Sequence, residues 1–379
     1  MKILQILTEL GAGGAEKVCL DISKGMQQKN HQVYVISLKS PSFNKTIEND
    51  FLQMNIKPQY LCMDSMKQIF LLFKLRKWIK KINPDIVHSH LMHPNLISRL
   101  ACLGLSIPLI NTIHISERRP HQSHFFLMDR LTLSCVSYYT CVSNASARFH
   151  EQKLHIAKNK IAVIYNGVDP VQPISSEEVQ QYKKAWNIED CTKILGSIGR
   201  FDWQKGYDRL FPILEKLSNN EKYAFVLLGD GKQRAELEKY ASTLPANIKC
   251  VMPGFFPNAS SLMTIFDAFI MPSRYEGYGL AFAEAMTLGL PCIVNNIDSL
   301  PEIAQNYKNA FVVNFDDIQQ SEHIATVIKQ ALHTRRCDSF VVMSKNDMIE
   351  EYSKAYILCI KKLIQPNRLN IFKTILYSK

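Results

Sequence analysis

The sequence has ten cysteines but no C-x-x-C pair, and it lacks any run of the roughly 18 apolar residues that a membrane-spanning helix needs. Most of the cysteines stand in apolar segments, which predicts buried, reduced thiols in a cytosolic protein. No low-complexity tract and no solenoid repeat is found. The apolar start, Met1–Leu7, resembles a signal peptide, but Glu9 and the glycines after it end it early, so a buried strand is predicted there.

The charge and the length of the chain indicate which partners it can bind and how many domains it can form. The chain has a formal net charge of +11 and a pI near 9.0, which favours anionic partners such as nucleotides, pyrophosphates or acidic lipid headgroups. Hydrophobic residues make up 46% of the chain, so it should bury substantial cores, and 379 residues suffice for two domains. Motifs that stack on RNA or read the major groove are absent, so nucleic acid is not an expected partner.

Apolar segments alternate with longer helical patterns, which is typical of parallel α/β layers. In the first half, strands are predicted at 2–8, 32–38, 85–89, 108–113, 139–142 and 161–164, and helices at 15–28, 68–82, 94–103 and 124–136. After a polar hinge from Asn166 to Pro173, strands are predicted at 193–198, 223–228, 248–251, 268–271, 291–294 and 311–313, and a last helix at about 345–364. The pattern predicts two doubly wound domains, each binding ligands at the carboxyl ends of its strands.

The most informative segment is Pro272–Met286, which holds Glu276 and Glu284 with seven residues between them. An apolar strand lies ahead of it, and two glycines after the first glutamate predict a sharp turn before a helix that begins near Leu280. The unpaired N–H groups at such a helix start bind phosphate readily. A loop carboxylate and a helix carboxylate beside them suit a nucleotide sugar, although an isolated match of this kind is more often an ordinary βα unit.

This segment resembles the E-x7-E signature of the retaining glycosyltransferases of family 4, which have the GT-B fold. Further landmarks of that family follow one another in the right order: Gly13-Gly14-Ala15-Glu16, Val87-His88-Ser89-His90, Asn166-Gly167-Val168-Asp169, Gly199-Arg200 with Lys205-Gly206, and Leu228-Gly229-Asp230-Gly231. Each motif alone is weak, but together they span nearly the whole chain. The resemblance implies two Rossmann-like domains facing a central cleft. The acceptor-binding domain would comprise 1–170 with a returning helix in 345–379, and the nucleotide-sugar-binding domain 171–344.

By the same resemblance, Arg200 and Lys205 hold the diphosphate of the donor, although alone they would be ordinary surface cations at a strand end. Glu276 corresponds to the residue that binds hydroxyls of the donor sugar, and Glu284 to the residue that holds the ribose. No Asp-x-Asp triplet occurs in the chain, so neither a divalent metal nor another cofactor is expected.

Backbone and turn residues complete the expected donor site. Amides around Tyr278, Gly279 and Leu280 would hold the distal phosphate. The turn at Gly229 and the loop Met252–Phe255 would border the nucleotide and its base. Ordinary turns at strand ends explain these two segments equally well.

In the N-terminal half, Gly13 and Gly14 follow the first strand, and in the resembled family this backbone closes over the donor phosphates and the acceptor. Glu16 spoils a G-x-G-x-x-G pattern and weakens an NAD-binding interpretation. His114 corresponds to the histidine that approaches the donor sugar and is expected to position it, although a lone histidine is more often structural. His88 and His90 are further candidates, with His90 shaping the acceptor side.

The chain is therefore expected to move a sugar, with retention, from a nucleotide-diphosphate donor, a UDP-sugar being favoured, to a glycan or a polyprenyl- or lipid-linked acceptor in bacterial surface polysaccharide assembly. It would be cytoplasmic, or bound at the cytoplasmic face of the inner membrane. One alternative is a GT-B nucleotide-sugar epimerase, which would isomerise a sugar without an acceptor. The other is a non-enzymatic binder of polyanions or membranes, motivated by the charge alone.

Three segments bear on contact with an anionic membrane or a lipid-linked acceptor. Residues 69–81 form a basic amphipathic pattern that can lie on a membrane, although a sheet-packing helix with a basic outer face is the favoured interpretation. A cationic loop with Arg118, Arg119, His121 and His124 suits an acceptor with a phosphate and an apolar tail, and the mixed basic and apolar stretch 368–379 is a further candidate for lipid contact. The chain departs from the family pattern at Gly277-Tyr278, at 295–302 and at 307–310, which leaves the details of donor-sugar recognition open.

Overall fold

The computed structural model describes residues 1–65, 68–115, 123–190, 192–217 and 221–364. The chain divides into an N-terminal unit, Met1–Gly167 with Lys345–Lys379, and a C-terminal unit, Val168–Ser344. The division falls inside the polar segment 166–173. Arg118, Arg119, His121, the side chain of His124 and the stretch 368–379, for which membrane contact is hypothesised, lie outside the described residues.

The N-terminal unit is built on a parallel sheet with the order β3-β2-β1-β4-β5-β6-β7. Its strands are β1 (Lys2–Leu7), β2 (Gln32–Ser37), β3 (Gln59–Tyr60), β4 (Ile86–His90), β5 (Leu109–Ile113), β6 (Tyr138–Cys141) and β7 (Ile161–Val163). Its helices are α1 (Gly14–Gln28), α2 (Thr46–Gln53), α3 (Leu71–Ile82), α4 (Met92–Cys102), α5 (Ser123–Leu131), α6 (Asn144–Leu154) and α14 (Lys345–Ile364).

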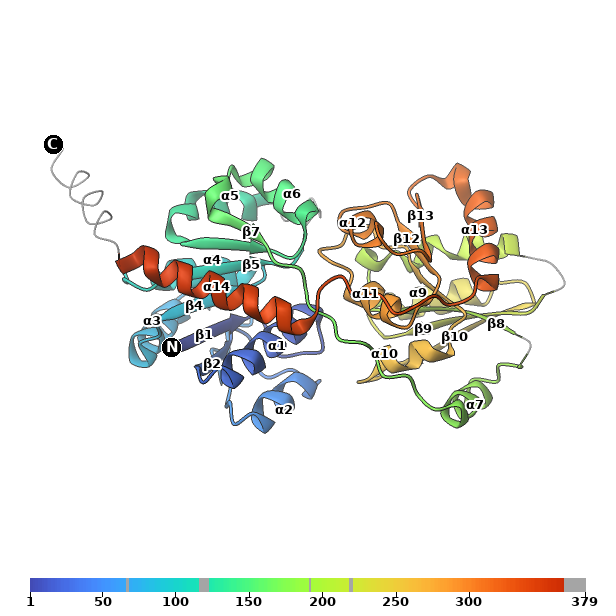
Figure 1. Ribbon diagram of the computed structural model, residues 1–379, viewed down its shortest axis with the longest axis horizontal. Helices are drawn as coiled ribbons and strands as arrows, with labels where there is room; N and C mark the ends of the chain where they lie inside the picture. Colours follow the sequence, from blue (N-terminus) through green and yellow to red (C-terminus); the bar gives the residue numbers. More distant parts are fainter. Residues whose placement is uncertain (66–67, 116–122, 191, 218–220, 365–379) are drawn as a thin grey trace. The chain divides into compact units, whose positions relative to one another are not determined.

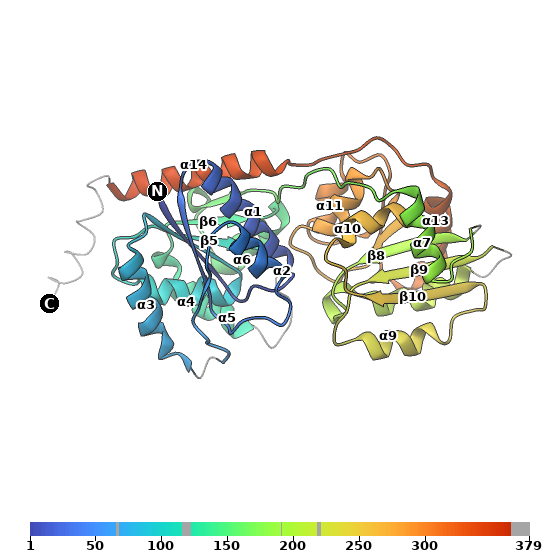
Figure 2. The ribbon, with the colours of Figure 1, turned by 90° about the horizontal axis from the view of Figure 1, so that it is seen from below.

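The last helix completes the core of the first unit. α14 packs against α1 on one face of the sheet, whereas α3 and α4 pack together on the other face (Figure 1, Figure 2). One side of α14 is buried through Met348, Ile349, Tyr352, Ala355, Tyr356 and Cys359. Gly25 of α1 lies so close to Ile349 that a Cβ there would come within 2.4 Å of its Cδ1. The apolar spacing of the sequence predicted this helix with the correct bounds.

The C-terminal unit repeats the same topology in six parallel strands, in the order β10-β9-β8-β11-β12-β13. The strands are β8 (Lys193–Ile198), β9 (Tyr223–Leu228), β10 (Ile248–Gly254), β11 (Ala268–Met271), β12 (Cys292–Asn295) and β13 (Ala310–Val313). The helices are α7 (Ser176–Ala185), α8 (Phe211–Leu214), α9 (Arg234–Ala241), α10 (Ala259–Leu262), α11 (Leu280–Thr287), α12 (Leu300–Ala304) and α13 (Ser321–His333). The fold class predicted from the sequence, α/β with two doubly wound parallel sheets, is therefore confirmed.

Strand order determines where each unit can bind a ligand. In a doubly wound sheet, helices leave in opposite directions from the two strands at which the order reverses, and this opens a crevice outside their carboxyl ends. The reversal falls between β1 and β4 in the N-terminal unit and between β8 and β11 in the C-terminal unit. The segments after β1, β8 and β11 contain the glycines 13 and 14, the cations 200 and 205, and the E-x7-E run, and His90 is the last residue of β4.

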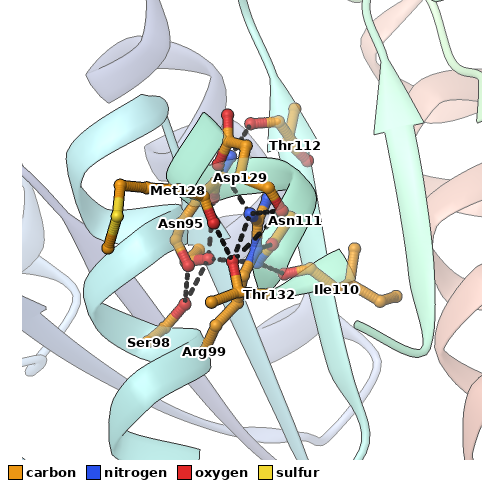
Figure 3. Close-up of polar contacts among 10 residues, drawn as sticks. Asn95, Ser98, Arg99, Ile110, Asn111, Thr112, Met128, Asp129 and Thr132 are labelled. Carbon is orange, nitrogen blue, oxygen red and sulfur yellow. Dashed lines mark hydrogen bonds and ion pairs between the residues drawn. The ribbon is translucent and has the colours of Figure 1, made fainter. Parts of the chain in front are cut away.

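A buried polar network lies between the sheet and α4 in the N-terminal unit (Figure 3). Arg99 is 2% exposed; its Nε donates to Asn111 Oδ1 at 2.6 Å, and its Nη1 donates to Asp129 Oδ1 at 2.6 Å and to Thr132 Oγ1 at 3.1 Å. Burial raises the pKa of Asp129 more strongly than the adjacent guanidinium lowers it. The network joins α4, β5 and α5 through polar contacts in an otherwise apolar layer.

Candidate active site

The loop after β8 places the two predicted cations differently. Asp202 caps the short 3-10 turn Trp203–Lys205: its Oδ1 accepts from the backbone N–H of Lys205, and its Oδ2 accepts from Arg200 Nε at 2.5 Å. Arg200 is largely exposed, whereas the Lys205 side chain is only 19% exposed. The helix predicted from about Tyr207 is instead a 3-10 turn, Tyr207–Arg209, followed by α8. Asp202 therefore anchors both cationic residues, Arg200 through its side chain and Lys205 through its backbone. Sequence reasoning missed this aspartate.

Lys205 and Glu276 form the centre of the candidate site in the C-terminal unit. The Nζ of Lys205 lies 2.6 Å from Oε1 of Glu276, whose side chain is 7% exposed. The same carboxylate oxygen accepts from Ser273 Oγ at 2.8 Å, and Asp298 Oδ2 accepts from the backbone N–H of Glu276 at 3.0 Å. The sequence singled out both members of the pair; the structure brings them together and adds Ser273 and Asp298 as supports.

The loop after β11 is held rigidly beside the first loop. Arg274 makes a two-pronged ion pair with Asp208, at 2.8 and 2.5 Å, and its guanidinium lies over the ring of Trp203. Asn295, fully buried, donates to the carbonyl oxygen of Ser273 at 2.8 Å. These contacts fix the Glu276 loop to the loop that carries Lys205.

Helix α11 begins where the sequence predicted. Gly279, with φ of +87°, is its N-cap, and the first intrahelical bond runs from the N–H of Ala283 to the carbonyl of Gly279. The N–H groups of the first turn therefore have no partner within the helix, and that turn holds no acidic side chain. Glu284 lies in the second turn and is partly buried, as is Leu280, whereas Tyr278 is buried. This helix end can accept an anion.

The glycine turn after β9 has a structural explanation. Gly229 has φ of +147°, and a Cβ on it would lie 2.0 Å from the carbonyl oxygen of Gly199. Gly231 approaches the backbone of Phe201 in the same way, at 2.4 Å from its carbonyl oxygen. Close packing of this turn against the Arg200 loop therefore requires glycines there, whatever ligand binds.

The N-terminal unit has a separate group of predicted residues at its own strand ends. Gly13 caps α1, Gly14 begins it, and the Glu16 carboxylate folds back so that a Cβ on Gly13 would lie 2.1 Å from Oε2. A carboxylate at this helix start disfavours a phosphate there, because its negative charge occupies the positive end of the helix dipole. The NAD-binding interpretation that Glu16 weakens in the sequence is disfavoured by this geometry as well.

The three histidines lie close together near the ends of β4 and β5. His90 Nδ1 is 2.9 Å from His114 Nε2, and the ring centroids of His88 and His90 are 4.0 Å apart. His88 and His90 have no exposed surface. His90 therefore has no exposed surface for a direct contact, and its expected role in shaping the acceptor side stays a prediction. His114 is partly exposed and borders a cavity of about 30 Å³, which has room for one or two waters.

Among the described residues, no group of three or more His, Cys, Asp or Glu side chains is arranged to hold a metal ion. Within the same ranges, no helix has the length and apolar character of a membrane span. Metal independence remains a prediction from the sequence.

Models of known glycosyltransferase families match both halves of the chain. The model of the glycosyltransferase family 4 matches residues 12–172, and that of the glycosyl transferases group 1 matches residues 178–356. The UDP-Gal:alpha-D-GlcNAc-diphosphoundecaprenol alpha-1,3-galactosyltransferase of Escherichia coli is 24% identical over 316 residues, which are 76% of this chain and 78% of that one. The N-acetyl-alpha-D-glucosaminyl L-malate synthase of Bacillus anthracis is 22% identical over 80% of this chain and 81% of its own.

Solved structures agree in fold. HepE of Anabaena, in a crystal structure with UDP and glucose, superposes with a TM-score of 0.73 at 17% identity, over 96% of this chain and 98% of its own. The sucrose-phosphate synthase of Thermosynechococcus elongatus superposes with a TM-score of 0.71 at 14% identity, over 100% of this chain and 98% of its own. With both halves matched by family models and with this architecture, the chain belongs to the GT-B glycosyltransferases of family 4.

Proposed function

We propose that this glycosyltransferase moves a sugar from a UDP-sugar to a glycan or polyprenyl-linked acceptor in surface polysaccharide assembly, keeping the anomeric configuration and using no divalent metal. The Lys205–Glu276 pair beside the start of α11 carries the proposal. The helix start and Lys205 together offer positive charge to a diphosphate, and Glu276 stands next to it with hydrogen-bond acceptors for sugar hydroxyls.

The hydrogen bonds of Glu276 favour a front-face reaction with retention over a double displacement in which this carboxylate attacks the sugar. Its Oε1 already accepts from Lys205 and Ser273, so it is tied as an acceptor and poorly suited to attack the sugar as a nucleophile. In the proposed reaction, the bond from the anomeric carbon to the departing phosphate oxygen breaks, and the acceptor oxygen bonds to the same face. The released phosphate oxygen takes the acceptor proton. Lys205, Arg200 and the α11 amides stabilise the diphosphate as its charge develops.

Relatives guide the choice of donor and acceptor. The similar Escherichia coli enzyme is named for UDP-galactose and a diphosphoundecaprenol-linked acceptor, and HepE was crystallised with UDP. We therefore expect UDP-sugars to raise the melting temperature of the protein, both with EDTA and with magnesium, and GDP- and ADP-sugars to leave it unchanged. With a polyprenyl-diphosphate sugar as acceptor, NMR of the product should show the anomeric configuration of the donor.

Three results would contradict this proposal. A product of inverted configuration would remove retention, stabilisation only with magnesium would remove metal independence, and isomerised free sugar without any acceptor would favour an epimerase.

The outer side of α3 suits an anionic membrane, where a polyprenyl-linked acceptor would reside. The helix buries Leu75 and Ile79, while Phe70 and Phe73 are 63% and 76% exposed and no acidic residue occurs from 69 to 82. The lysines 74, 77, 80 and 81 are also exposed. Arg76 donates to the carbonyl oxygens of Ala101 and Leu103, which brings the exposed Leu103 beside α3. Exposed aromatic and aliphatic side chains among lysines are typical of interfacial helices.

We expect the double variant Phe70→Ser/Phe73→Ser to lower co-sedimentation with phosphatidylglycerol vesicles at least tenfold, since each buried phenylalanine contributes roughly 1.5–3 kcal/mol. Phe43→Ser is the matched control, because Phe43 is a fully exposed phenylalanine of the same unit. Equal binding by wild type and the double variant, or wild-type binding to soluble polyanions with none to vesicles, would contradict the membrane proposal.

A further inference from the structure

The loop after β12 holds the loop that carries Glu276 at two backbone positions. Asn295, the last residue of β12, is fully buried, and its Nδ2 donates to the carbonyl oxygen of Ser273 at 2.8 Å. Three residues later, Asp298 Oδ2 accepts from the backbone N–H of Glu276 at 3.0 Å. Both contacts come from the segment 295–302, in which the chain departs from the family pattern.

These two side chains take the place of a turn hydrogen bond. In a tight four-residue turn, the carbonyl of the first residue usually accepts from the N–H of the fourth. Ser273 and Glu276 would be those two residues, but the side chain of Asn295 binds the carbonyl and that of Asp298 binds the N–H. The Glu276 loop is therefore held open, and its course depends on side chains from the loop after the neighbouring strand.

Asp298 adopts a backbone conformation that favours glycine. Its φ is +48°, and it is the second residue of a turn in which the N–H of Leu300 donates to the carbonyl of Ile297 at 3.1 Å. A side chain at positive φ strains the backbone, although Asp and Asn tolerate it better than most residues. Strain of this kind persists where surrounding contacts over-determine a residue, and it clusters at functional sites. Glycine would relieve the strain, but it would also remove the acceptor of the Glu276 N–H.

The position of the Glu276 carboxylate depends on the same contact. Its Oε1 accepts from Lys205 Nζ at 2.6 Å and from Ser273 Oγ at 2.8 Å, while Asp298 fixes its main chain. A shift of the main chain would therefore move the carboxylate away from Lys205. All four residues belong to the C-terminal unit, so the arrangement is complete within that unit.

We propose that Asp298 is a positioning residue for Glu276: it keeps the Glu276 loop open, so that the carboxylate stays beside Lys205 and can bind hydroxyls of the donor sugar. The inference rests on the proposed function for the contact of Glu276 with the sugar. Because Asp298 acts through Glu276, its loss weakens the hold on the sugar and leaves the binding of the nucleotide diphosphate unchanged.

The test compares Asp298→Asn with Asp298→Gly in the full chain. Asparagine keeps an oxygen that can accept from the Glu276 N–H and tolerates the positive φ, whereas glycine relieves the strain and removes the acceptor. Asp298→Asn should retain most of the wild-type kcat/KM. Asp298→Gly should lower it about 10-fold, since misplacing a positioned group by about 1 Å can slow a reaction up to about 100-fold. Inhibition by UDP should be the same in all three proteins, and thermal melts should show that Asp298→Gly is folded.

A double-mutant cycle with Glu276→Ala shows whether Asp298 acts through Glu276. If it does, Asp298→Gly lowers kcat/KM in the wild-type background but has no further effect once the carboxylate is absent. Equal losses in both backgrounds, or an Asp298→Gly enzyme as active as Asp298→Asn, would overturn the proposal.

A second measurement needs no substrate. Acylation of Lys205 by acetic anhydride, followed by mass spectrometry, reports whether its ammonium is still paired with Glu276. The rate should rise several-fold in Asp298→Gly and stay near the wild-type value in Asp298→Asn, with Lys216 as the internal reference. An unchanged rate in Asp298→Gly would contradict the positioning role even if no donor were turned over. A wild type that neither binds nor turns over any UDP-sugar would instead count against the proposed function.

Discussion

Lys205→Ala is expected to lower turnover about 100- to 1,000-fold, the range typical for removing one preorganised group that stabilises developing negative charge. Lys205 is the partly buried cation next to Glu276 and the start of α11, and its ammonium is tied at 2.6 Å to that carboxylate. Without it, the departing diphosphate loses a charge partner, and Glu276 loses the contact that orients it. The measurement is UDP release with a donor that stabilises the protein.

The matched control is Lys216→Ala. Lys216 pairs with Glu322 at 2.9 Å in the same unit, but at 36% and 81% exposure, so removing it should leave turnover unchanged. Thermal melts of both variants establish that the fold survives. Turnover of Lys205→Ala within threefold of wild type would exclude the proposed role of this lysine.

Arg99→Ala is expected to destabilise the N-terminal unit by about 3–5 kcal/mol, because it leaves the carboxylate of Asp129 buried without its partner. Hydrogen exchange of the amides in α4 and β5 reports opening of this unit alone. The control is Lys39→Ala, which removes the Lys39–Glu9 ion pair of the same unit. That pair is 43% and 44% exposed, so its loss should lower the free energy of unfolding by less than about 1 kcal/mol.

The double variant Arg99→Met/Asp129→Leu should recover more than half of that loss. Burial outweighs the guanidinium in setting the pKa of Asp129, which shows that its charged form is costly in the folded unit. A raised folded-state pKa means that this carboxyl favours folding at low pH and that its contribution is lost as pH rises through the raised value. Replacing both charges removes that cost. If the double variant were as unstable as Arg99→Ala, the ion pair itself would be the stabilising element.

Most strands and the last helix were predictable because burial imposes a clear apolar pattern on them. Helix α7 was missed because none of its residues is buried, and only its capping box, Ser175 with Glu178, marked its start. Strand β3 has two residues at a sheet edge, too short for any pattern. The helix predicted from about 124 to 136 ends at Leu131, and a separate 3-10 turn follows.

Site residues were predictable where a local motif marked them. Lys205 and Glu276 stand in recognisable segments, but their contact joins positions 71 residues apart, and Asp298 supports Glu276 from a further 22 residues away. No local pattern encodes such pairings. The histidines were considered one at a time, whereas the fold connects His88 to Tyr356 across 268 residues. His88 and His90 have no exposed surface, which their separate positions in the sequence did not reveal.

The position of α14 in the sequence has a consequence for biosynthesis. The N-terminal unit is made first, but Tyr352, Tyr356 and the other buried side chains of α14 reach it only after the whole C-terminal unit has been made. Val168–Ser344 contains its own sheet and core and emerges from the ribosome before α14 does. The second unit should therefore become protease-resistant during synthesis, while the first stays exposed to proteases and chaperones until α14 emerges.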